Sequence, residues 1–415
     1  MELYTRKERM KQKTILITGA TGFLGSFITQ ELLEAGFRLK LLVRKTHDLQ
    51  ATERVSEIFP LSALSVFADR TRVGRIEIIE GDVSKKYLGL DTREYRRLAE
   101  TIDEVFHCAA ATKFNDGHNT LTQTNVSGTE TVVRFCYTEK IKRLHYISTA
   151  YVAGKRRDVV YEDELDKGQA FNNNYEKSKF DAEKILGQFV RQYDVPTTVY
   201  RPSIIVGDSR TGYTKNYDNI YIFGKGLYYL KNYKTQKSHE NDFAINPKRM
   251  HQSSYVRIPG DKYGTINLTP VDYAARTIIA ISRRDESINE TFHIVNPSPP
   301  TLGEIAEWMA VATGNRIRIL RFHELQAQPY TVFEKLFLRG TEAFQPYLFG
   351  EPCFDSTNTK RLLCGTGIEC PLITQELINR CIQYGVDTHW GKKNTTSGKE
   401  DISLKIQEPL LSVIV

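Results

Sequence analysis

Residues 14–36 read TILITGATGFLGSFITQELLEAG, and this stretch decides the fold of the 415-residue chain. Residues 14–18 form an apolar run rich in branched side chains, which predicts a strand, and residues 23–35 repeat apolar side chains with a helical period. Three glycines lie in the turn between them. Glycine permits a tight turn, close approach of backbone to a phosphate, and close packing of helix on strand. The stretch therefore predicts a strand, a phosphate-binding turn and a helix whose N-terminus faces the anion.

Strand and helix patterns alternate along the rest of the first half of the chain. The further strands are expected at residues 38–44, 75–81, 104–110, 143–149 and 196–202. This alternation indicates a parallel sheet covered by helices on both faces, and right-handed crossovers make such a sheet doubly wound. We predict an α/β fold with a Rossmann-type, doubly wound parallel sheet and a smaller C-terminal substrate-binding cap.

The domain organisation follows from a change of pattern after Gly207. The next segment is rich in Tyr, Lys and Asn without clean periodicity, and strand and helix patterns resume near residue 264. The last residues begin with linker composition and end in LLSVIV, which predicts a flexible tail. The expected parts are a nucleotide-binding domain of residues 14–207 plus 264–298, a cap of residues 208–263 plus 299–391, and the tail 392–415.

Composition and charge limit the classes of function. The chain is 40% hydrophobic and 26% charged, which is ordinary for a globular protein. No apolar run approaches the ~18 residues of a membrane-spanning helix, and the first residues do not read as a secretory signal, so we expect a soluble, cytoplasmic protein. The net charge of +7 favours anionic partners without implying nucleic acid. The six cysteines form no CxxC pair, so we expect reduced thiols and no metal site.

The end of the second strand bears on the choice of dinucleotide. Proteins that bind NAD place an acid there for the ribose, whereas an arginine accommodates the extra phosphate of NADP. Here the strand ends in Arg44 and Lys45, and the nearest following acid is Asp48. We therefore predict NADP(H); the alternative is that both cations only cap a strand end in water. After the third strand, Asp82 could hold an adenine amino group or could be a solvated loop residue.

A catalytic group is predicted from three side chains. Tyr175 and Lys179 are one helical turn apart, so they project from the same helix face. A phenol has a pKa near 10, and we expect the neighbouring ammonium to lower it. Ser148 and Thr149 end the fifth strand, at the sheet edge where open α/β folds bind ligands. An isolated YxxxK match arises often by chance, but here it follows a dinucleotide turn in the expected order.

From residue 14 to about residue 300, the chain resembles the extended short-chain dehydrogenase/reductases. That family is recognised by TGxxGxxG, a hydroxyl residue after the fifth strand, and YxxxK, all of which occur here. ISTAYVAG (147–154) aligns Thr149 with the family's catalytic hydroxyl, and NVSGT (125–129) aligns Asn125 with the asparagine that holds the lysine through water. The resemblance implies that the catalytic residues are Thr149, Tyr175, Lys179 and Asn125.

The same resemblance extends to the cofactor-binding segments. The RPS run at 201–203 resembles the segment that passes the nicotinamide carboxamide, and HCAAATKF (107–114) resembles the fourth-strand loop along the cofactor. The residues implied to bind the dinucleotide are Gly19, Thr21, Gly22, Phe23, Leu24, Gly25, Arg44, Lys45, Asp82, Val83, Ala109, Ala110, Ala111, Lys179, Pro202 and Ser203.

Within the family, four segments look like thioester reductases and fatty acyl-CoA reductases, a group that includes the terminal reductase modules of nonribosomal peptide and polyketide synthases. They are VFHCAAATKFN, STAYV, YEKSKFDAE and RPSIIVGDSRTG. GDSRTG (207–212) is the most telling, because sugar epimerases usually diverge there, and FDSTNTKRLL (354–363) resembles the C-terminal region of fatty acyl reductases. The resemblance implies that NADPH reduces an acyl thioester, on a carrier protein or CoA, to an aldehyde; further reduction to an alcohol stays open.

Two other functions use the same motifs. A short-chain dehydrogenase/reductase could act on a free ketone, an alcohol or a nucleotide sugar with the same three side chains. A non-catalytic NADP-binding sensor or assembly protein would be expected to lack the tyrosine or the lysine, and both are present.

Two surfaces of the predicted protein could contact the substrate. Residues 213–233 suit a pocket for an acyl chain and a phosphopantetheine arm, or a cap that packs on its own tyrosines. Basic residues cluster at 140–143, at 155–157 and between 231 and 262. These are either solvated faces or a surface that docks an acidic carrier protein.

Overall fold

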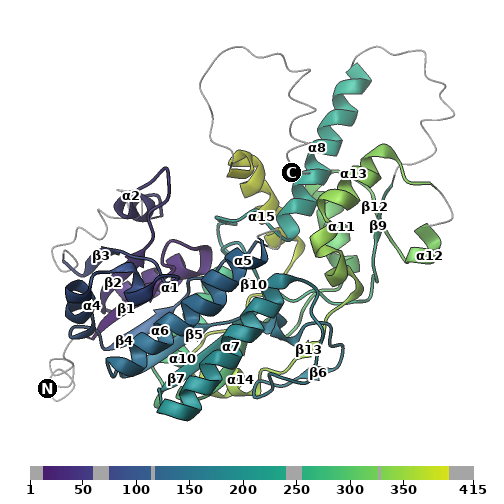
Figure 1. The fold of residues 1–415 in the computed structure, drawn as a ribbon. Helices are drawn as coiled ribbons and strands as arrows, with labels where there is room; N and C mark the ends of the chain where they lie inside the picture. The colour runs from purple at the N-terminus through teal and green to yellow at the C-terminus, as the bar shows by residue number, and fades with distance from the viewer. Residues whose placement is uncertain (1–12, 59–73, 114–116, 240–254, 326–328, 392–415) are drawn as a thin grey trace, which may run out of the picture. The chain divides into compact units, whose positions relative to one another are not determined.

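The computed structural model describes residues 13–58, 74–113, 117–239, 255–325 and 329–391 (Figure 1). The predicted tail 392–415 lies outside these residues. The chain divides into two compact units. The first comprises Met1–Ser203, Val271–Val295 and Cys353–Glu369, and the second comprises Ile204–Pro270, Asn296–Pro352 and Cys370–Val415.

The first unit is built on a seven-stranded sheet in the order β11-β7-β5-β4-β1-β2-β3. Every neighbouring pair is parallel. Its strands are β1 (Thr14–Thr18), β2 (Arg38–Val43), β3 (Ile76–Glu80), β4 (Glu104–His107), β5 (Arg143–Ile147), β7 (Thr197–Pro202) and β11 (Thr291–Ile294). The strand order reverses between β1 and β4, and ligands of open sheets bind at the carboxyl ends of such a pair. The predicted Rossmann-type α/β fold is confirmed.

Helices cover both faces of this sheet. On one face α6 and α7 lie side by side (Figure 1), and elsewhere α1 packs against α10. A buried apolar cluster joins the strands to the helices, with Leu16, Val105 and Leu144 from the sheet and Val132 and Leu186 from the helices. The helices are α1 (Phe23–Glu34), α2 (Ala51–Ser56), α4 (Thr92–Ala99), α5 (His118–Leu121), α6 (Gly128–Thr138), α7 (Asn174–Tyr193), α10 (Val271–Ser282) and α14 (Thr357–Leu363).

Short elements complete the first unit. They are the 3-10 helices η1 (Lys86–Gly89), η3 (Ala150–Ala153) and η4 (Asp285–Ser287), the π-helix η2 (Thr122–Ser127), and the strands β6 (Val159–Val160) and β13 (Cys353–Phe354). The fourth strand ends at His107, three residues earlier than predicted. The chain leaves the ladder there and passes the glycine turn, where Ala109 lies against Gly19.

One assignment to the cap is wrong. Residues 353–369 were predicted to belong to the cap, and they pack in the first unit. Strand β13 pairs with β6. The buried Glu162 carboxylate accepts hydrogen bonds from the His293 amide at 2.8 Å and from the Thr359 hydroxyl at 2.9 Å. These contacts join segments far apart in the sequence, so no local pattern signals them.

The second unit is mainly helical. Helix α11 packs on α15, and α8 contacts both. Two parallel strand pairs, β8 with β10 and β9 with β12, accompany them. The elements are β8 (Ile204–Val206), α8 (Ile220–His239), β9 (Val256–Pro259), β10 (Leu268–Pro270), α11 (Leu302–Thr313), β12 (Ile317–Leu320), α12 (Phe322–Leu325), α13 (Val332–Gly340), η5 (Glu342–Phe349), α15 (Gln375–Asp387) and η6 (His389–Gly391). Among the helices of the described residues, none combines the length and low polarity that crossing a bilayer requires.

The tyrosine-rich segment supplies part of the second unit's core. The rings of Tyr217 and Tyr228 lie 6.1 and 6.2 Å from the Trp390 ring, between centroids. Tyr217 also meets Tyr221 edge to face, and the Tyr221 hydroxyl accepts a hydrogen bond from the Gly207 amide at 2.9 Å. Several of these tyrosines therefore pack on their own neighbours, which was one of the two predicted alternatives.

Candidate active site

The turn between β1 and α1 requires glycine at two of its three glycine positions. Gly19 has a φ of +74°, and a Cβ there would lie 2.4 Å from the Ala109 nitrogen. A Cβ on Gly25 would lie 2.1 Å from the Gly19 oxygen. Side chains are excluded because the β4 loop and the first turn of α1 approach the glycine backbone this closely.

The N-terminus of α1 is open to an anion. Its N-cap is Gly22, which makes no side-chain capping bond, and no acidic residue lies in the first turn. The first backbone N–H groups of a helix have no partner within the helix, and they carry its positive dipole end. The turn and helix end therefore fit the pyrophosphate of a dinucleotide.

Cations gather beside this turn. Arg44 and Lys45 are exposed at the end of β2, and Lys45 pairs with Glu80 at 3.2 Å. Arg54, on α2, donates to the Thr21 hydroxyl at 3.0 Å and to the carbonyl oxygen of Arg44. Burial, followed by the charge of Arg44, lowers the pKa of Arg54. The sequence analysis missed Arg54, since only the fold brings α2 to the glycine turn.

The other predicted cofactor residues line the same edge of the sheet. The Asp82 carboxylate accepts from the amide and hydroxyl of Ser84, at 3.0 and 2.7 Å, so it also caps its own turn. Val83 is buried beside it. Ala109 donates its amide to the Thr18 hydroxyl at 3.4 Å, and Ser203 donates its amide to the Ile294 carbonyl at 3.1 Å.

Thr149 and Tyr175 meet at the end of β5. Their hydroxyls are hydrogen-bonded to each other. Thr149 also donates to the Pro202 carbonyl at 3.4 Å. Tyr175 is held in the first turn of α7, which Asn173 caps by accepting from the Glu176 amide at 2.9 Å. The structure therefore joins two of the predicted catalytic side chains.

Lys179 lies in the same region, but its ammonium has other partners. It donates to the Tyr146 hydroxyl and to the Ile147 carbonyl, each at 2.8 Å. Burial lowers the pKa of Lys179 to about 7, and the Glu183 carboxylate opposes that shift. Burial raises the pKa of Tyr175 to about 12, opposed by the Thr149 hydrogen bond. The predicted lowering of the phenol pKa is therefore wrong for this structure.

Asn125 lies on the π-helix η2 and holds the loop after β4. Its Oδ1 accepts from the Ala111 amide at 2.8 Å. Its Nδ2 donates to the Ala111 carbonyl at 3.0 Å and to the Ser178 hydroxyl at 2.9 Å. None of these bonds goes to Lys179, so Asn125 fixes the backbone along the predicted cofactor groove.

A buried ion pair separates the roles of the two neighbouring hydroxyl residues. Glu183 and Arg201 are 5% and 2% exposed and pair through the Arg201 guanidinium. Ser148 donates to the Glu183 carboxylate at 2.6 Å, so its only proton is engaged away from Tyr175. The bond from Thr149 to the Pro202 carbonyl is much longer, at 3.4 Å, and its acceptor is uncharged, so Thr149 is the better candidate for holding a substrate oxygen.

Comparison with known proteins agrees with this geometry. The family model described as "Male sterility protein", an NAD-binding family, matches residues 17–278. The chain belongs to this family. The resemblance to reductases of the thioester type, stated from the sequence, is confirmed, and the nicotinamide dinucleotide is the family's ligand.

The relatives of this protein include parts of large synthetases. It is 26% identical to a linear gramicidin synthase protein of Brevibacillus parabrevis, over 89% of this chain and 7% of that protein. It is 26% identical to a carboxylic acid reductase of Mycobacterium tuberculosis, over 72% of this chain and 26% of that protein. The chain thus spans a small part of the length of these relatives.

Solved structures of reductase domains share its fold. The terminal R domain from the myxalamid PKS-NRPS biosynthetic pathway is 30% identical, with a TM-score of 0.72 and 91% of each chain covered. The R domain of a nonribosomal peptide synthetase from Mycobacterium tuberculosis is 21% identical, with a TM-score of 0.68 and coverage of 92% of this chain and 93% of that one. At 21% identity, the similarity to the Mycobacterium tuberculosis domain shows a shared fold.

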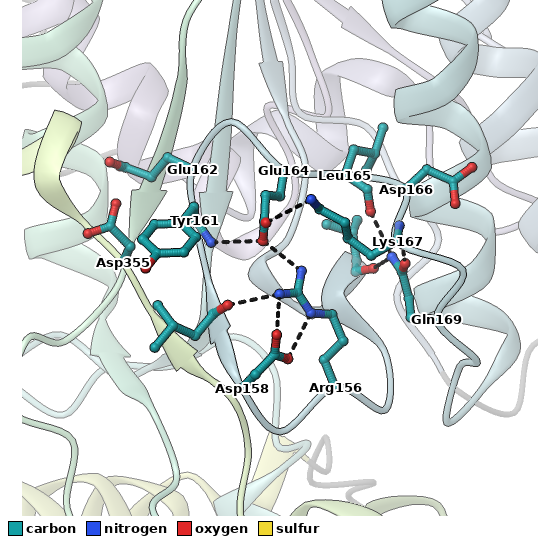
Figure 2. Close-up of polar contacts among 12 residues, drawn as sticks. Arg156, Asp158, Tyr161, Glu162, Glu164, Leu165, Asp166, Lys167, Gln169 and Asp355 are labelled. Carbon is teal, nitrogen blue, oxygen red and sulfur yellow. Dashed lines mark hydrogen bonds and ion pairs between the residues drawn. The ribbon is translucent and has the colours of Figure 1, made fainter.

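Two of the predicted basic clusters have some of their cations engaged in contacts within the protein. Figure 2 shows Arg156 between Asp158 and Glu164, to which it pairs at 2.7 and 2.8 Å, with Lys167 3.0 Å from Glu164. These carboxylates raise the pKa of Arg156. Only Lys155 and Arg157 of the cluster 155–157 stay exposed without such an ion pair in the described part of the chain.

The cluster 140–143 was predicted to lie on an exposed face, but its arginine is buried. Arg143 is 6% exposed and donates to the Thr198 hydroxyl at 2.7 Å. Lys142 is exposed and pairs with Asp103 at 2.6 Å. Burial of Arg143 follows from its place at the start of β5, a central strand of the sheet.

The third cluster is described only in part. Residues 240–254 lie outside the described residues, and Arg257 pairs with Glu334 at 2.7 Å. A docking surface for an acidic partner therefore has fewer available cations than the sequence indicates.

Proposed function

We propose that this protein is an NADPH-dependent reductase that converts an acyl thioester into an aldehyde. The observation that carries the proposal is the hydrogen-bonded pair of Thr149 and Tyr175 hydroxyls, at the sheet edge that also bears the glycine turn. Membership of the family and the similarity to reductase domains support it.

The protein's own groups have distinct tasks in this reaction. A bound nicotinamide dinucleotide would supply the hydride. Thr149 and Tyr175 hold the carbonyl oxygen and stabilise the negative charge that develops on it. Tyr175 donates its phenolic proton to that oxygen, which suits a group that is protonated at neutral pH. The resulting hemithioacetal then breaks its C–S bond. Its hydroxyl group loses its proton as the carbonyl re-forms, and the leaving sulfur takes up a proton, so the aldehyde and a thiol are released; the thiolate leaves readily because thiols have a pKa near 8.5.

NADP rather than NAD is supported by two cations at the end of β2 and one on α2. Arg44, Lys45 and Arg54 lie beside the glycine turn, and Arg44 and Arg54 raise each other's electrostatic energy. An added phosphate dianion relieves that repulsion and accepts bidentate hydrogen bonds from guanidinium groups. The ribose diol of NAD offers no charge to balance these cations.

An apolar substrate is supported by a cavity of about 70 Å³ within the second unit. Apolar cavities of this kind exclude ordered water and accept hydrocarbon. A cavity of this volume and lining suits a short hydrocarbon group and does not suit a nucleotide sugar. The cavity is lined by Ile204, Asn219, Ile220, Phe223, Leu227, Ile258, Ile266, Leu302, Ile305, Ala306, Met309, Ile317, Ile319, Phe344, Tyr347 and Leu348.

Delivery of the acyl group on a phosphopantetheine arm is supported by likeness to the structure of a thiolation-reductase di-domain from an archaeal nonribosomal peptide synthetase, at 20% identity and a TM-score of 0.67. That likeness concerns the fold, so the carrier is part of the proposal. Lys155 and Arg157 are exposed cations that an acidic carrier could contact. Whether one hydride or two are transferred is decided by product analysis.

The test is NADPH oxidation with an acyl-CoA, a carrier-bound acyl thioester, a free ketone and a nucleotide sugar. We expect turnover with the thioesters, an aldehyde or alcohol as product, and a 10²- to 10⁴-fold lower kcat in Tyr175→Phe. Added salt should weaken transfer from the carrier more than from acyl-CoA. Tyr161→Phe, which changes an exposed tyrosine, is the control. Turnover of ketones or nucleotide sugars alone, or full activity of Tyr175→Phe, contradicts the proposal.

A further inference from the structure

A chain of buried polar side chains begins at Lys179 and runs beneath the candidate site. Its first member is Tyr146 on β5, which is 0% exposed. The Lys179 ammonium donates to the Tyr146 oxygen at 2.8 Å and lies 4.3 Å from the centre of the Tyr146 ring. Tyr146 therefore meets the ammonium with both its hydroxyl and its π face.

Thr129 on α6 belongs to the same buried group through His107, whose ring lies 5.7 Å from the Tyr146 ring. Thr129 donates its single proton to the Asn125 carbonyl at 2.6 Å, because a carbonyl oxygen can only accept. Thr129 therefore has no proton left for another acceptor. The Lys179 ammonium can only donate, so the Tyr146 oxygen accepts from it through a lone pair.

His107 completes this group of buried polar side chains, and its two ring nitrogens have defined hydrogen-bonding roles. Its Nε2 lies 3.2 Å from the Thr129 oxygen and its Nδ1 lies 2.7 Å from the Thr18 hydroxyl. Thr129 has no further proton to donate, so Nε2 carries the imidazole proton and Nδ1 accepts from Thr18. Burial, followed by the charge of Lys179, lowers the pKa of His107 to about 3, so the ring is neutral. The hydrogen bonds of Thr18, Thr129 and His107 therefore each have a defined donor.

We propose that Tyr146 is a positioning residue for Lys179, holding the ammonium through its phenolic oxygen and the face of its ring. The expected change in kinetics rests on the proposed function, whereas the expected change in the titration of Lys179 rests on the hydrogen-bond geometry alone. Tyr146 acts through Lys179 and does not touch the reacting atoms.

The groups around Lys179 determine what removal of the Tyr146 hydroxyl does. They are Tyr175 and Glu183 on α7, Cys108 and His107 at the end of β4, and Tyr146 on β5. Burial raises the pKa of the Cys108 thiol to about 12, so this group and neutral His107 bring no negative charge. Glu183 is already engaged by Arg201 and Ser148. The ammonium is therefore stabilised by the charge of Glu183 and by the oxygens of Tyr146 and Ile147, which accept its hydrogen bonds at 2.8 Å each.

Removal of the Tyr146 oxygen disfavours the ammonium relative to the neutral amine. The pKa of Lys179, already lowered to about 7 by burial, should fall further in Tyr146→Phe. Because a hydrogen bond to a charged group is stronger than a neutral one, we expect a fall of about one pH unit or more. The alkaline limb of the kcat/KM profile should move to lower pH by the same amount.

Tyr200→Phe is the matched control. Tyr200 is also 0% exposed and lies on the neighbouring strand β7, and its hydroxyl is hydrogen-bonded to His145 Nδ1 at 3.0 Å. Both variants remove one hydroxyl from the core of the sheet, so a merely structural role predicts equal effects. A positioning role predicts that only Tyr146→Phe changes the titration of Lys179.

The experiment is an NMR titration of Lys179 in protein labelled with ¹³C-lysine, with the Lys179 signal assigned from Lys179→Arg. We expect the midpoint to fall in Tyr146→Phe and to stay unchanged in Tyr200→Phe. Should Tyr146→Phe fail to fold, Tyr146→Met, whose flexible side chain fills irregular space, carries the test. An unchanged midpoint in the folded variants, or an equal shift in Tyr200→Phe, overturns the proposal. The titration needs no turnover, so absence of reductase activity in the wild type would refute the proposed function alone.

Discussion

The glycine turn and the group around Lys179 lie at the same sheet edge, but different kinds of contact build them. In the turn, Gly19, Gly22 and Gly25 contact one another across a few residues. Around Lys179, the contacts to Tyr146 and Ile147 span 33 and 32 residues. The comparison shows that a short sequence motif can specify a backbone shape, whereas the direction of a long side chain depends on residues that only the fold brings near.

The largest effect is expected at the glycine turn. In Gly25→Ala the new methyl group would meet the Gly19 oxygen at 2.1 Å, so the turn must open and the anion site must be lost. We expect dinucleotide affinity to fall about 100-fold, measured by calorimetric titration with NADPH. Gly117→Ala is the control, because nothing lies within 4 Å of its Cβ position. Unchanged affinity in Gly25→Ala would break the assignment of this turn as the cofactor site.

A smaller effect is expected at Arg54, the residue that joins the turn to α2. Arg54→Ala should weaken NADPH binding about 10-fold, since one charge-assisted contact to a phosphate is lost, and should leave NADH binding nearly unchanged. Arg134→Ala, which removes an exposed arginine paired with Glu130, is the control. An equal loss for both dinucleotides would show that Arg54 supports the turn instead of recognising the phosphate.

A further effect concerns Lys179 and the pH dependence of the protein's stability. Its pKa is lowered from 10.5 to about 7 on folding, so between these values the unfolded chain binds more protons. Stability relative to Lys179→Met should then rise with pH, by up to about 1.4 kcal/mol per pH unit between pH 7 and 10.5, and be level below pH 7. Urea denaturation at pH 6, 8 and 9 measures this difference, with Lys177→Met on the same helix as control. A level difference throughout would mean that Lys179 is not a buried, destabilised ammonium.

The sequence predicted the sheet and the candidate residues well, because both leave local patterns. Six strands were expected within a few residues of their observed bounds, since a buried parallel strand must be a short apolar run. Thr149 and Tyr175 were recognised by motif and are hydrogen-bonded in the structure. Arg54, Glu183 and Tyr146 were not singled out, because no spacing rule connects them to the glycine turn or to YxxxK.

By itself the sequence determined the α/β fold, the dinucleotide turn and the identity of the candidate catalytic side chains. Each of these depends on residues close together in the sequence, where the conformational freedom of glycine and the period of the helix determine the local structure. The tertiary structure alone decided where the Lys179 ammonium points, which cations stay exposed, and that residues 353–369 join the first unit. These depend on contacts between distant segments, and burial changes both the partners and the pKa values of the groups involved.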